Sequence, residues 1–335
     1  MSDALIEVED LTVEFPLSRG VLRAVDRASF EVRRGEALGL VGESGSGKTM
    51  ALRSLIGLLP RSARIAGGSI RLDGTELVGA SDATLRGLRG RTVAMVFQEP
   101  MTALNPVMRI GEQIAETPLV RLGYSRRRAK ERALELMRLV GIPDPARRYE
   151  AFPHELSGGM RQRVVIATAL SGDPKLLLCD EPTTALDVTI QDQILKLLAS
   201  LREELGVSIL FVSHDLAVIA QTCRRVAVMY AGQLVETGTV DAIFREPHHP
   251  YTLGLLRSVP SFDSVRDHLS SIPGAPPDLA SPPSGCRFHP RCGFARPDCA
   301  EGTIPLIDLG ARAARCLYHE DCADEARREP VVANA

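Results

Sequence analysis

Short apolar runs alternate with helical patterns and turn signals along the first three quarters of the chain, from Leu5 to about Glu246. Continuous apolar runs, which are expected for central parallel strands buried on both faces, occur at residues 37–41, 176–179 and 208–212. Two early segments, 7–15 and 68–74, instead alternate apolar and polar residues and contain or adjoin turns, which is typical of antiparallel strands. The succession of strands and helices predicts an α/β fold.

The stretch from about residue 99 to 160 is predicted to be helical. Its clearest helix covers residues 126–140, where Ser125 can cap the amino end and Gly141 provides a stop. The apolar residues that we expect on one face of this helix are Ala129, Ala133, Leu134, Met137 and Val140.

The amino-acid composition of the sequence changes near residue 248. Eleven of the 22 prolines lie between Pro247 and Pro305, a density that prevents a continuous helix or a central strand. We therefore predict a domain over residues 1–248 and a small extension over 249–335. The extension has too little apolar content for a core of its own, so we expect a metal or disulfides to hold it together.

Charge and hydropathy exclude several classes of protein. With 40 basic and 42 acidic residues the net charge is −2, so the strongly basic balance of a nucleic-acid binder is missing. The first residues lack a basic segment followed by an apolar run, and no window has the 18 or so apolar residues of a membrane span. We expect a cytosolic chain that does not cross the membrane itself, in which clustered cysteines bind metal rather than form disulfides.

A phosphate-binding loop follows the apolar run 37–41. The motif G-x-x-x-x-G-K-[ST] predicts that backbone N–H groups and a helix amino end face phosphates, with Lys48 at the β/γ oxygens and Thr49 on Mg²⁺. The alternative is a glycine-rich turn that binds nothing. The expected ATP-binding residues of the loop are Gly42, Glu43, Ser44, Gly45, Ser46, Gly47, Lys48 and Thr49.

Two acidic residues end the apolar run 176–179. Asp180 can hold Mg²⁺ or its water shell, and Glu181 can orient and deprotonate the attacking water as a general base. A solvated strand end is the alternative for such a pair in isolation. The phosphate-binding loop favours the catalytic interpretation.

A second anion-binding helix terminus is predicted at Ser157-Gly158-Gly159. Ser157 stands at the capping position, and the two glycines leave backbone donors exposed. In isolation this segment would be a capped helix behind a flexible turn.

Taken together, these segments resemble the ATP-binding subunits of ABC transporters over about 240 residues. The resemblance implies that Gln98 is the glutamine that touches Mg²⁺ and the attacking water. It also makes residues 156–162 the signature motif, with Met160 where the commonest form has Gln, and Asp187 part of the loop that follows the catalytic glutamate. His214 corresponds to the switch histidine at the γ-phosphate. Phe15 is similar to the aromatic residue that stacks on adenine, although it fits a core strand equally well.

The resemblance also implies a fold and a mechanism. We expect a P-loop NTPase (RecA-like) core, an antiparallel β subdomain, an α-helical ABC subdomain over about 99–160, and a Cys/Pro-rich C-terminal extension. Two such domains bind ATP head to tail, and each supplies its signature helix to the phosphates of the other. Closure on ATP and opening after hydrolysis then drive two membrane subunits.

The proline-rich tail narrows the resemblance. By composition alone, residues 249–256, 272–277 and 285–292 predict a docking surface. In order and spacing they are similar to the C-terminal extension of oligopeptide/dipeptide importer ATPases, of the D-type. The partners implied are two transmembrane permeases, an extracytoplasmic peptide-binding protein and a second ATPase, either a different chain or a copy of this one. This chain is then peripheral on the cytoplasmic face of the inner membrane. Relatives also move nickel, glutathione or sugars.

Five of the seven cysteines fall within 37 residues of the tail. Four thiolates suit Zn²⁺ or an iron–sulfur cluster. The spacing lacks the tight C-x₂-C knuckles usual for zinc, and some relatives resemble 4Fe-4S carriers, so a 4Fe-4S cluster is favoured over zinc or free thiols. The expected ligands are Cys286, Cys292, Cys299 and Cys316, with Cys322 as a substitute.

Two other classes share the nucleotide motifs. A non-transport ABC ATPase of DNA repair or translation is disfavoured, because Thr49 and Ser157 are only 108 positions apart and there is one ATPase cassette. The basic run 126–130 has no interleaved aromatic residues, so it predicts a solvated helix face and no nucleic-acid contact. An iron–sulfur regulator with a vestigial ATPase is disfavoured by the intact motifs.

Overall fold

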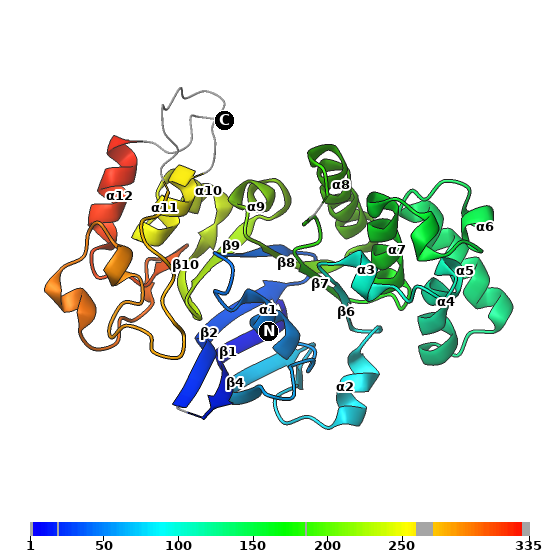
Figure 1. Ribbon diagram of the computed structural model, residues 1–335, viewed down its shortest axis with the longest axis horizontal. Helices are drawn as coiled ribbons and strands as arrows, with labels where there is room; N and C mark the ends of the chain where they lie inside the picture. Colours follow the sequence, from blue (N-terminus) through cyan, green and yellow to red (C-terminus); the bar gives the residue numbers. More distant parts are fainter. Residues whose placement is uncertain (1–2, 19, 185, 259–270, 330–335) are drawn as a thin grey trace. The chain divides into compact units, whose positions relative to one another are not determined.

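The apolar runs form strands, and the expected α/β fold is confirmed in the computed structural model (Figure 1). The structure describes residues 3–18, 20–184, 186–258 and 271–329. The chain divides into two units. The first holds the described residues of 1–5, 32–37 and 79–211, and the second holds those of 6–31, 38–78 and 212–335.

The first unit contains a parallel pair of buried strands, β6 (Val93–Val96) and β7 (Leu176–Asp180), with Val93 opposite Leu176. Strand β8 (Ser208–Ser213), most of which lies in this unit, follows β7 in the strand order. All three strands are buried along their whole length, which explains their unbroken apolar sequence. The helices of the unit are α2 (Asp82–Leu88), α3 (Pro100–Ala103), α4 (Ile110–Arg121), α5 (Arg126–Leu139), α6 (Pro145–Arg148), η1 (Pro153–Glu155), α7 (Gly158–Leu170) and α8 (Val188–Leu205).

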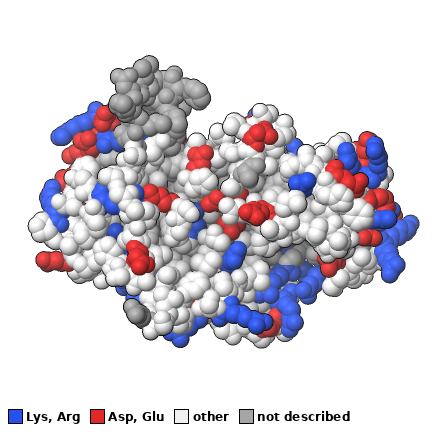
Figure 2. All heavy atoms as spheres, viewed as in Figure 1, with Lys and Arg blue, Asp and Glu red and all other residues white. Residues whose placement is uncertain are grey.

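Helix α5 confirms most of the predicted helix over 126–140. Ser125 caps it, and its side chain accepts a hydrogen bond from the Arg128 amide. Leu136 is fully buried, whereas Leu134, which we expected on the buried face, is only half-buried. The basic residues of the run 126–130 are exposed. Basic and acidic side chains are mixed on the face drawn in Figure 2, and Arg132 of α5 pairs with Glu135 at 3.4 Å.

The second unit contains two sheets. One is antiparallel, in the order β2-β1-β4-β5, and pairs Ile6 with Leu72. The other has the order β11-β12-β10-β9-β3 within this unit, and β3 and β9 are parallel. The strands are β1 (Ala4–Leu17), β2 (Gly20–Arg33), β3 (Ala37–Val41), β4 (Arg64–Leu72), β5 (Thr75–Glu76), β9 (Arg225–Tyr230), β10 (Gln233–Thr239), β11 (Ile307–Asp308) and β12 (Ala313–Ala314).

The C-terminal extension is built into the second unit through the edge of this sheet. Strand β12 pairs antiparallel with β10, so that Ala314 lies opposite Glu236, and β11 pairs with β12. The backbone amide of Arg315 donates to Val235 at 2.7 Å. The helices of the unit are α1 (Lys48–Ser54), α9 (Leu216–Thr222), α10 (Val240–Arg245), α11 (Pro250–Ser258), η2 (His289–Arg291), η3 (Pro297–Ala300) and α12 (His319–Arg328).

Helices α11 and α12 pack against one another through a small apolar cluster of Leu253, Cys322 and Ala326. Among the described residues, no helix combines the length and the apolar content of a membrane span. The predicted division of the chain at residue 248 stays a prediction.

Candidate ATP-binding and hydrolysis residues

The phosphate-binding loop connects β3 to α1 in the second unit. Gly47 precedes α1 with φ +106°, and a side chain there would approach the Ala24 carbonyl to 2.1 Å, so glycine is required at this position. The ammonium group of Lys48 is buried and donates to the Gly42 carbonyl at 2.7 Å and to the Glu43 carbonyl at 2.9 Å. The loop is therefore folded around the lysine expected to meet the β/γ-phosphates.

Neighbouring backbone supports the loop from the β9–β10 turn. The Gly232 amide donates to the Ser46 carbonyl at 2.8 Å, and the Gly232 carbonyl accepts from the Asp26 amide at 2.8 Å. Helix α1, which follows the loop, ends at Ser54. Thr49 is half-buried, and Ser44 and Gly45 are exposed.

The catalytic residues expected after β7 lie in the first unit. Asp180 is the last residue of the strand and is buried. Glu181 follows it with φ +45°, an uncommon conformation for a residue with a side chain that costs about 1–2 kcal/mol. Such strain is often found at functional residues.

The structure brings Gln98 and Glu181 together. Gln98 donates from Nε2 to Glu181 Oε2 at 3.3 Å, and the Thr184 hydroxyl donates to the same oxygen at 3.0 Å. Two donors fix the carboxylate orientation, although 83 residues separate Gln98 from Glu181. The sequence did not predict a separate role for Thr184, because the residue type alone does not show that its hydroxyl donates to Glu181.

The signature segment forms the amino end of α7 as expected. Ser157 caps the helix by accepting from the Met160 amide at 3.3 Å, and Ser157 and Gly158 are exposed. A side chain at Gly159 would approach Ile190 of α8 to 2.7 Å, which explains the second glycine. The helix begins at Gly158, so the glycine pair is already helical.

The remaining predicted residues occupy different structural settings. Asp187 caps α8 by accepting from the Ile190 amide at 3.0 Å. His214 follows β8 and is exposed, and it belongs to the second unit. Phe15 lies in β1 and is half-buried, which leaves both interpretations of this residue open.

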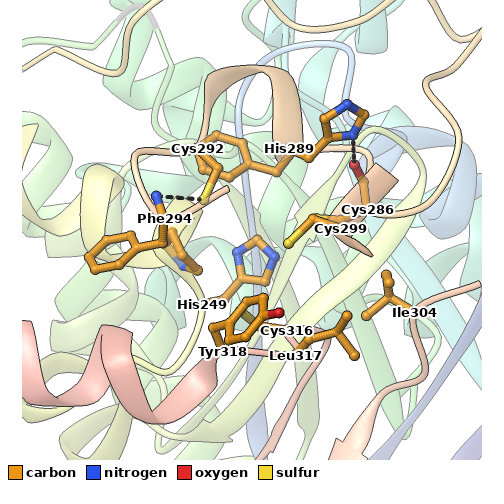
Figure 3. Close-up of a pocket in the computed structure, with 12 residues that line it drawn as sticks. His249, Cys286, His289, Cys292, Phe294, Cys299, Ile304, Cys316, Leu317 and Tyr318 are labelled. Carbon is orange, nitrogen blue, oxygen red and sulfur yellow. Dashed lines mark hydrogen bonds between the residues drawn. The ribbon is translucent and has the colours of Figure 1, made fainter. Parts of the chain in front are cut away.

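The four predicted cysteine ligands line one small cavity in the second unit. Figure 3 shows Cys286, Cys292, Cys299 and Cys316 around it together with His249. Cys292 Sγ accepts a hydrogen bond from the Phe294 amide at 3.3 Å. Burial raises the pKa of the Cys292 thiol to about 11 and that of Cys316 to about 12. Cys322, the expected substitute, is instead buried in the apolar cluster of α11 and α12.

The expected metal site is not present as such. Within the part of the chain that the structure describes, no group of three or more His, Cys, Asp or Glu side chains is arranged to hold a metal ion. This finding gives no support to zinc, the alternative to the favoured cluster, since zinc gathers its ligands at about 2.0–2.3 Å around one ion. The 4Fe-4S cluster has no direct support in the structure either.

Of the three segments predicted to form a docking surface, 249–256 is mostly buried and 285–292 is mostly half-buried, whereas 272–277 is mostly exposed. Tyr251 and His249 are almost fully inaccessible, and Phe288 is 3% exposed. Composition alone could not separate the buried segment from the exposed one, because rigid turns rich in proline occur in buried connections as well as on surfaces.

A phosphate-binding loop, an acidic strand end bonded to a glutamine, and a capped glycine-rich helix terminus define an ATPase of the ABC class. Two family models match: "ABC transporter" over residues 25–184 and "Oligopeptide/dipeptide transporter, C-terminal region" over residues 235–299. The chain is 50% identical over 293 residues to the oligopeptide transport ATP-binding protein OppD of Bacillus subtilis, covering 87% of this chain and 82% of that one.

Similar relationships hold for two further proteins. The dipeptide transport ATP-binding protein DppD of Escherichia coli is 44% identical, covering 96% of this chain and 98% of that one. The solved dimeric structure of MJ0796, described as a bacterial ABC transporter cassette, has a TM-score of 0.63 at 27% identity and covers 70% of this chain and 98% of that one. This chain belongs to the oligopeptide and dipeptide transport ATP-binding proteins of the ABC transporters. The resemblance seen in the sequence is confirmed.

Proposed function

We propose that the chain is the ATP-hydrolysing subunit of a peptide importer, with Glu181 as the general base. The main support for this role of Glu181 is that the Gln98 amide and the Thr184 hydroxyl both donate to one of its carboxylate oxygens. This geometry holds the carboxylate in a fixed direction, and a carboxylate held in this way can accept a proton from water.

Each remaining residue contributes to binding or charge stabilisation. The backbone of residues 42–49 and Lys48 bind the phosphates, and Ser157, Gly158 and Gly159 contribute a helix amino end to a nucleotide held by a partner ATPase. Asp187, His214 and Phe15 keep the roles expected from the family. On the family resemblance, Thr49, Gln98 and Asp180 are proposed as Mg²⁺ ligands, because the ion prefers hydroxyl, amide and carboxylate oxygens; when bound it would neutralise the charge of the phosphates.

The partners proposed are two permeases, a second ATPase and an extracytoplasmic peptide-binding protein, with this chain on the cytoplasmic face of the membrane. Support comes from the relatives named for oligopeptide and dipeptide transport and from the matched C-terminal region. Peptides are proposed as the cargo over nickel, glutathione or sugars for the same reason. Neither a DNA-repair nor a translation protein is among the relatives described above.

Composition of the purified complex tests this proposal. We expect a tagged chain extracted from membranes in detergent to carry two polytopic permeases and a second ATPase, identified by mass spectrometry. A substrate-binding protein should join after crosslinking in the presence of peptide. Co-purification of ribosomes or DNA in place of permeases would contradict the transport role.

For the cysteine cavity we propose a 4Fe-4S cluster. What supports it is the donor set: four thiols from separate segments line one cavity, and the Cys292 sulfur accepts an N–H hydrogen bond, as cluster thiolates do. A cubane cluster is wider than a single ion, so its ligands need not converge as closely as those of zinc. The cluster would cross-link four segments of the extension when bound.

Anaerobic purification with iron and acid-labile sulfide assays tests the cluster. We expect about four iron atoms and four sulfides per chain. Cys299→Ser should reduce both, whereas Cys322→Ser should retain them because Cys322 packs with Leu253 and Ala326. A chain that carries zinc without iron, or neither, would rule the cluster out.

A further inference from the structure

Two residues of the C-terminal extension contact Glu43, the second residue of the phosphate-binding loop. The guanidinium of Arg291 donates from Nη1 to Glu43 Oε2 at 2.8 Å and from Nη2 to Glu43 Oε1 at 3.1 Å. The backbone amide of Glu43 donates to the Tyr251 hydroxyl at 2.7 Å. Both the side chain and the backbone of Glu43 are therefore held by residues more than 200 positions away.

Arg291 is itself fixed in place. Its side chain is 6% exposed, compared with 26% for Glu43. Nε donates to the Pro273 carbonyl at 2.8 Å, and Nη1 also donates to the Tyr230 hydroxyl at 3.2 Å. A bidentate arginine–carboxylate pair of this kind fixes the relative orientation of the two side chains as well as attracting them, and a lysine cannot reproduce this geometry.

Aromatic rings pack around these contacts. The rings of Tyr230 and Tyr251 lie 4.5 Å apart, and Phe288 meets Tyr230 edge-on at 5.2 Å. Tyr230 ends β9, Tyr251 lies in α11, and Phe288 precedes η2. Since Tyr230 and Tyr251 are fully buried, their hydroxyl groups have little freedom to move away from Arg291 and Glu43.

A second arginine between Cys286 and Cys292, Arg287, also supports the phosphate-binding loop. Arg287 pairs with buried Asp26 at 2.5 Å and donates to the Ala231 carbonyl. Ala231 precedes Gly232, whose amide donates to the Ser46 carbonyl of the phosphate-binding loop at 2.8 Å. Arg287 and Arg291 are the first and last residues between Cys286 and Cys292, so one segment of five residues braces the loop at two points.

We propose that Arg291, with Tyr251, is a positioning residue that keeps the phosphate-binding loop in its nucleotide-binding conformation, so that the C-terminal extension sets the affinity of the chain for ATP. Neither residue belongs to a nucleotide motif. Arg291 acts through Glu43, whose backbone precedes the turn that encloses Lys48. A loop that already has its binding conformation binds ATP without losing further conformational entropy.

The kinetic constants of the complete detergent-purified transporter complex test this proposal. For Arg291→Gln we expect the KM for ATP to rise about three- to tenfold and kcat to stay within about twofold of the wild-type value. The rise is modest because only part of the free energy of the two charge-assisted hydrogen bonds contributes to ATP binding. Direct titration with a fluorescent ATP analogue should show the same loss of affinity. Arg291→Lys, which keeps the charge but not the fork, should not restore the wild-type KM.

A double-mutant cycle separates positioning from general stability. Glu43→Gln alone should raise KM, and Glu43→Gln combined with Arg291→Gln should raise it no further than the single changes. The matched control is Arg257→Gln, which breaks pairs with Glu325 and Glu329 inside the same extension and should leave KM unchanged.

Three results would overturn the proposal. They are a folded Arg291→Gln complex with wild-type KM and nucleotide affinity, additive effects in the cycle, or an equal rise in KM for Arg257→Gln. If Arg291→Gln does not assemble, Arg291→Lys and Glu43→Gln provide the same comparison. An unchanged KM in both of these would also contradict it.

Discussion

Glu181→Gln lowers the kcat for ATP hydrolysis by about 10²–10⁴-fold, the usual contribution of a positioned general base, while ATP still binds. The amide has nearly the shape of the carboxylate and retains an oxygen that can accept from Gln98 or from Thr184. It cannot take a proton from water. The expected result is a complex that binds ATP with wild-type affinity but turns over very slowly.

Phosphate release by the purified complex at saturating Mg-ATP measures the first quantity, and equilibrium binding of labelled ATP measures the second. Glu203→Gln is the matched control because it neutralises an exposed acid of α8, with a side chain 72% exposed. It should keep wild-type turnover. Undiminished hydrolysis by Glu181→Gln would remove Glu181 from the catalytic role.

Lys48→Ala weakens ATP binding by about 10- to 100-fold, because it removes the ammonium group that bonds the phosphates with charge-assisted hydrogen bonds of about 1.5–3 kcal/mol. In the structure the same group holds together the carbonyls of Gly42 and Glu43. The substitution therefore removes a phosphate ligand and loosens the loop.

Equilibrium dialysis with labelled ATP, supported by a thermal unfolding curve, measures this effect. Lys196→Ala is the control, because Lys196 is a largely exposed lysine on α8 that pairs with Asp192 at 2.8 Å. Binding of ATP to Lys48→Ala at wild-type strength would show that the loop does not hold the phosphates.

Local sequence predicted the elements whose causes are local. Strand β3 covers the predicted residues 37–41, and Ser157 and Ser125 act as the helix caps that were predicted. The phosphate-binding loop could be located from its residues because spacing and glycine content determine its conformation. The burial of Leu136 in place of Leu134 shows that the tertiary neighbours of α5 select its exact face.

Contacts across long stretches of chain could not be predicted. The pairing of β12 with β10 joins two-residue and seven-residue strands that carry no shared pattern. Arg291 and Glu43 are 248 positions apart, and their residue types alone do not predict that they pair with one another. The four cysteines predicted as ligands line one cavity, but their spacing did not show that their side chains lack the arrangement of a metal site.

The most direct test of the central claim is peptide accumulation in sealed vesicles that contain the purified complex, with ATP on the side of this chain and a radiolabelled dipeptide together with the binding protein on the other. We expect concentrative uptake that requires hydrolysable ATP and disappears with Glu181→Gln. Uptake that continues at the wild-type rate in the Glu181→Gln complex, or no peptide uptake by a complex that hydrolyses ATP, would contradict it.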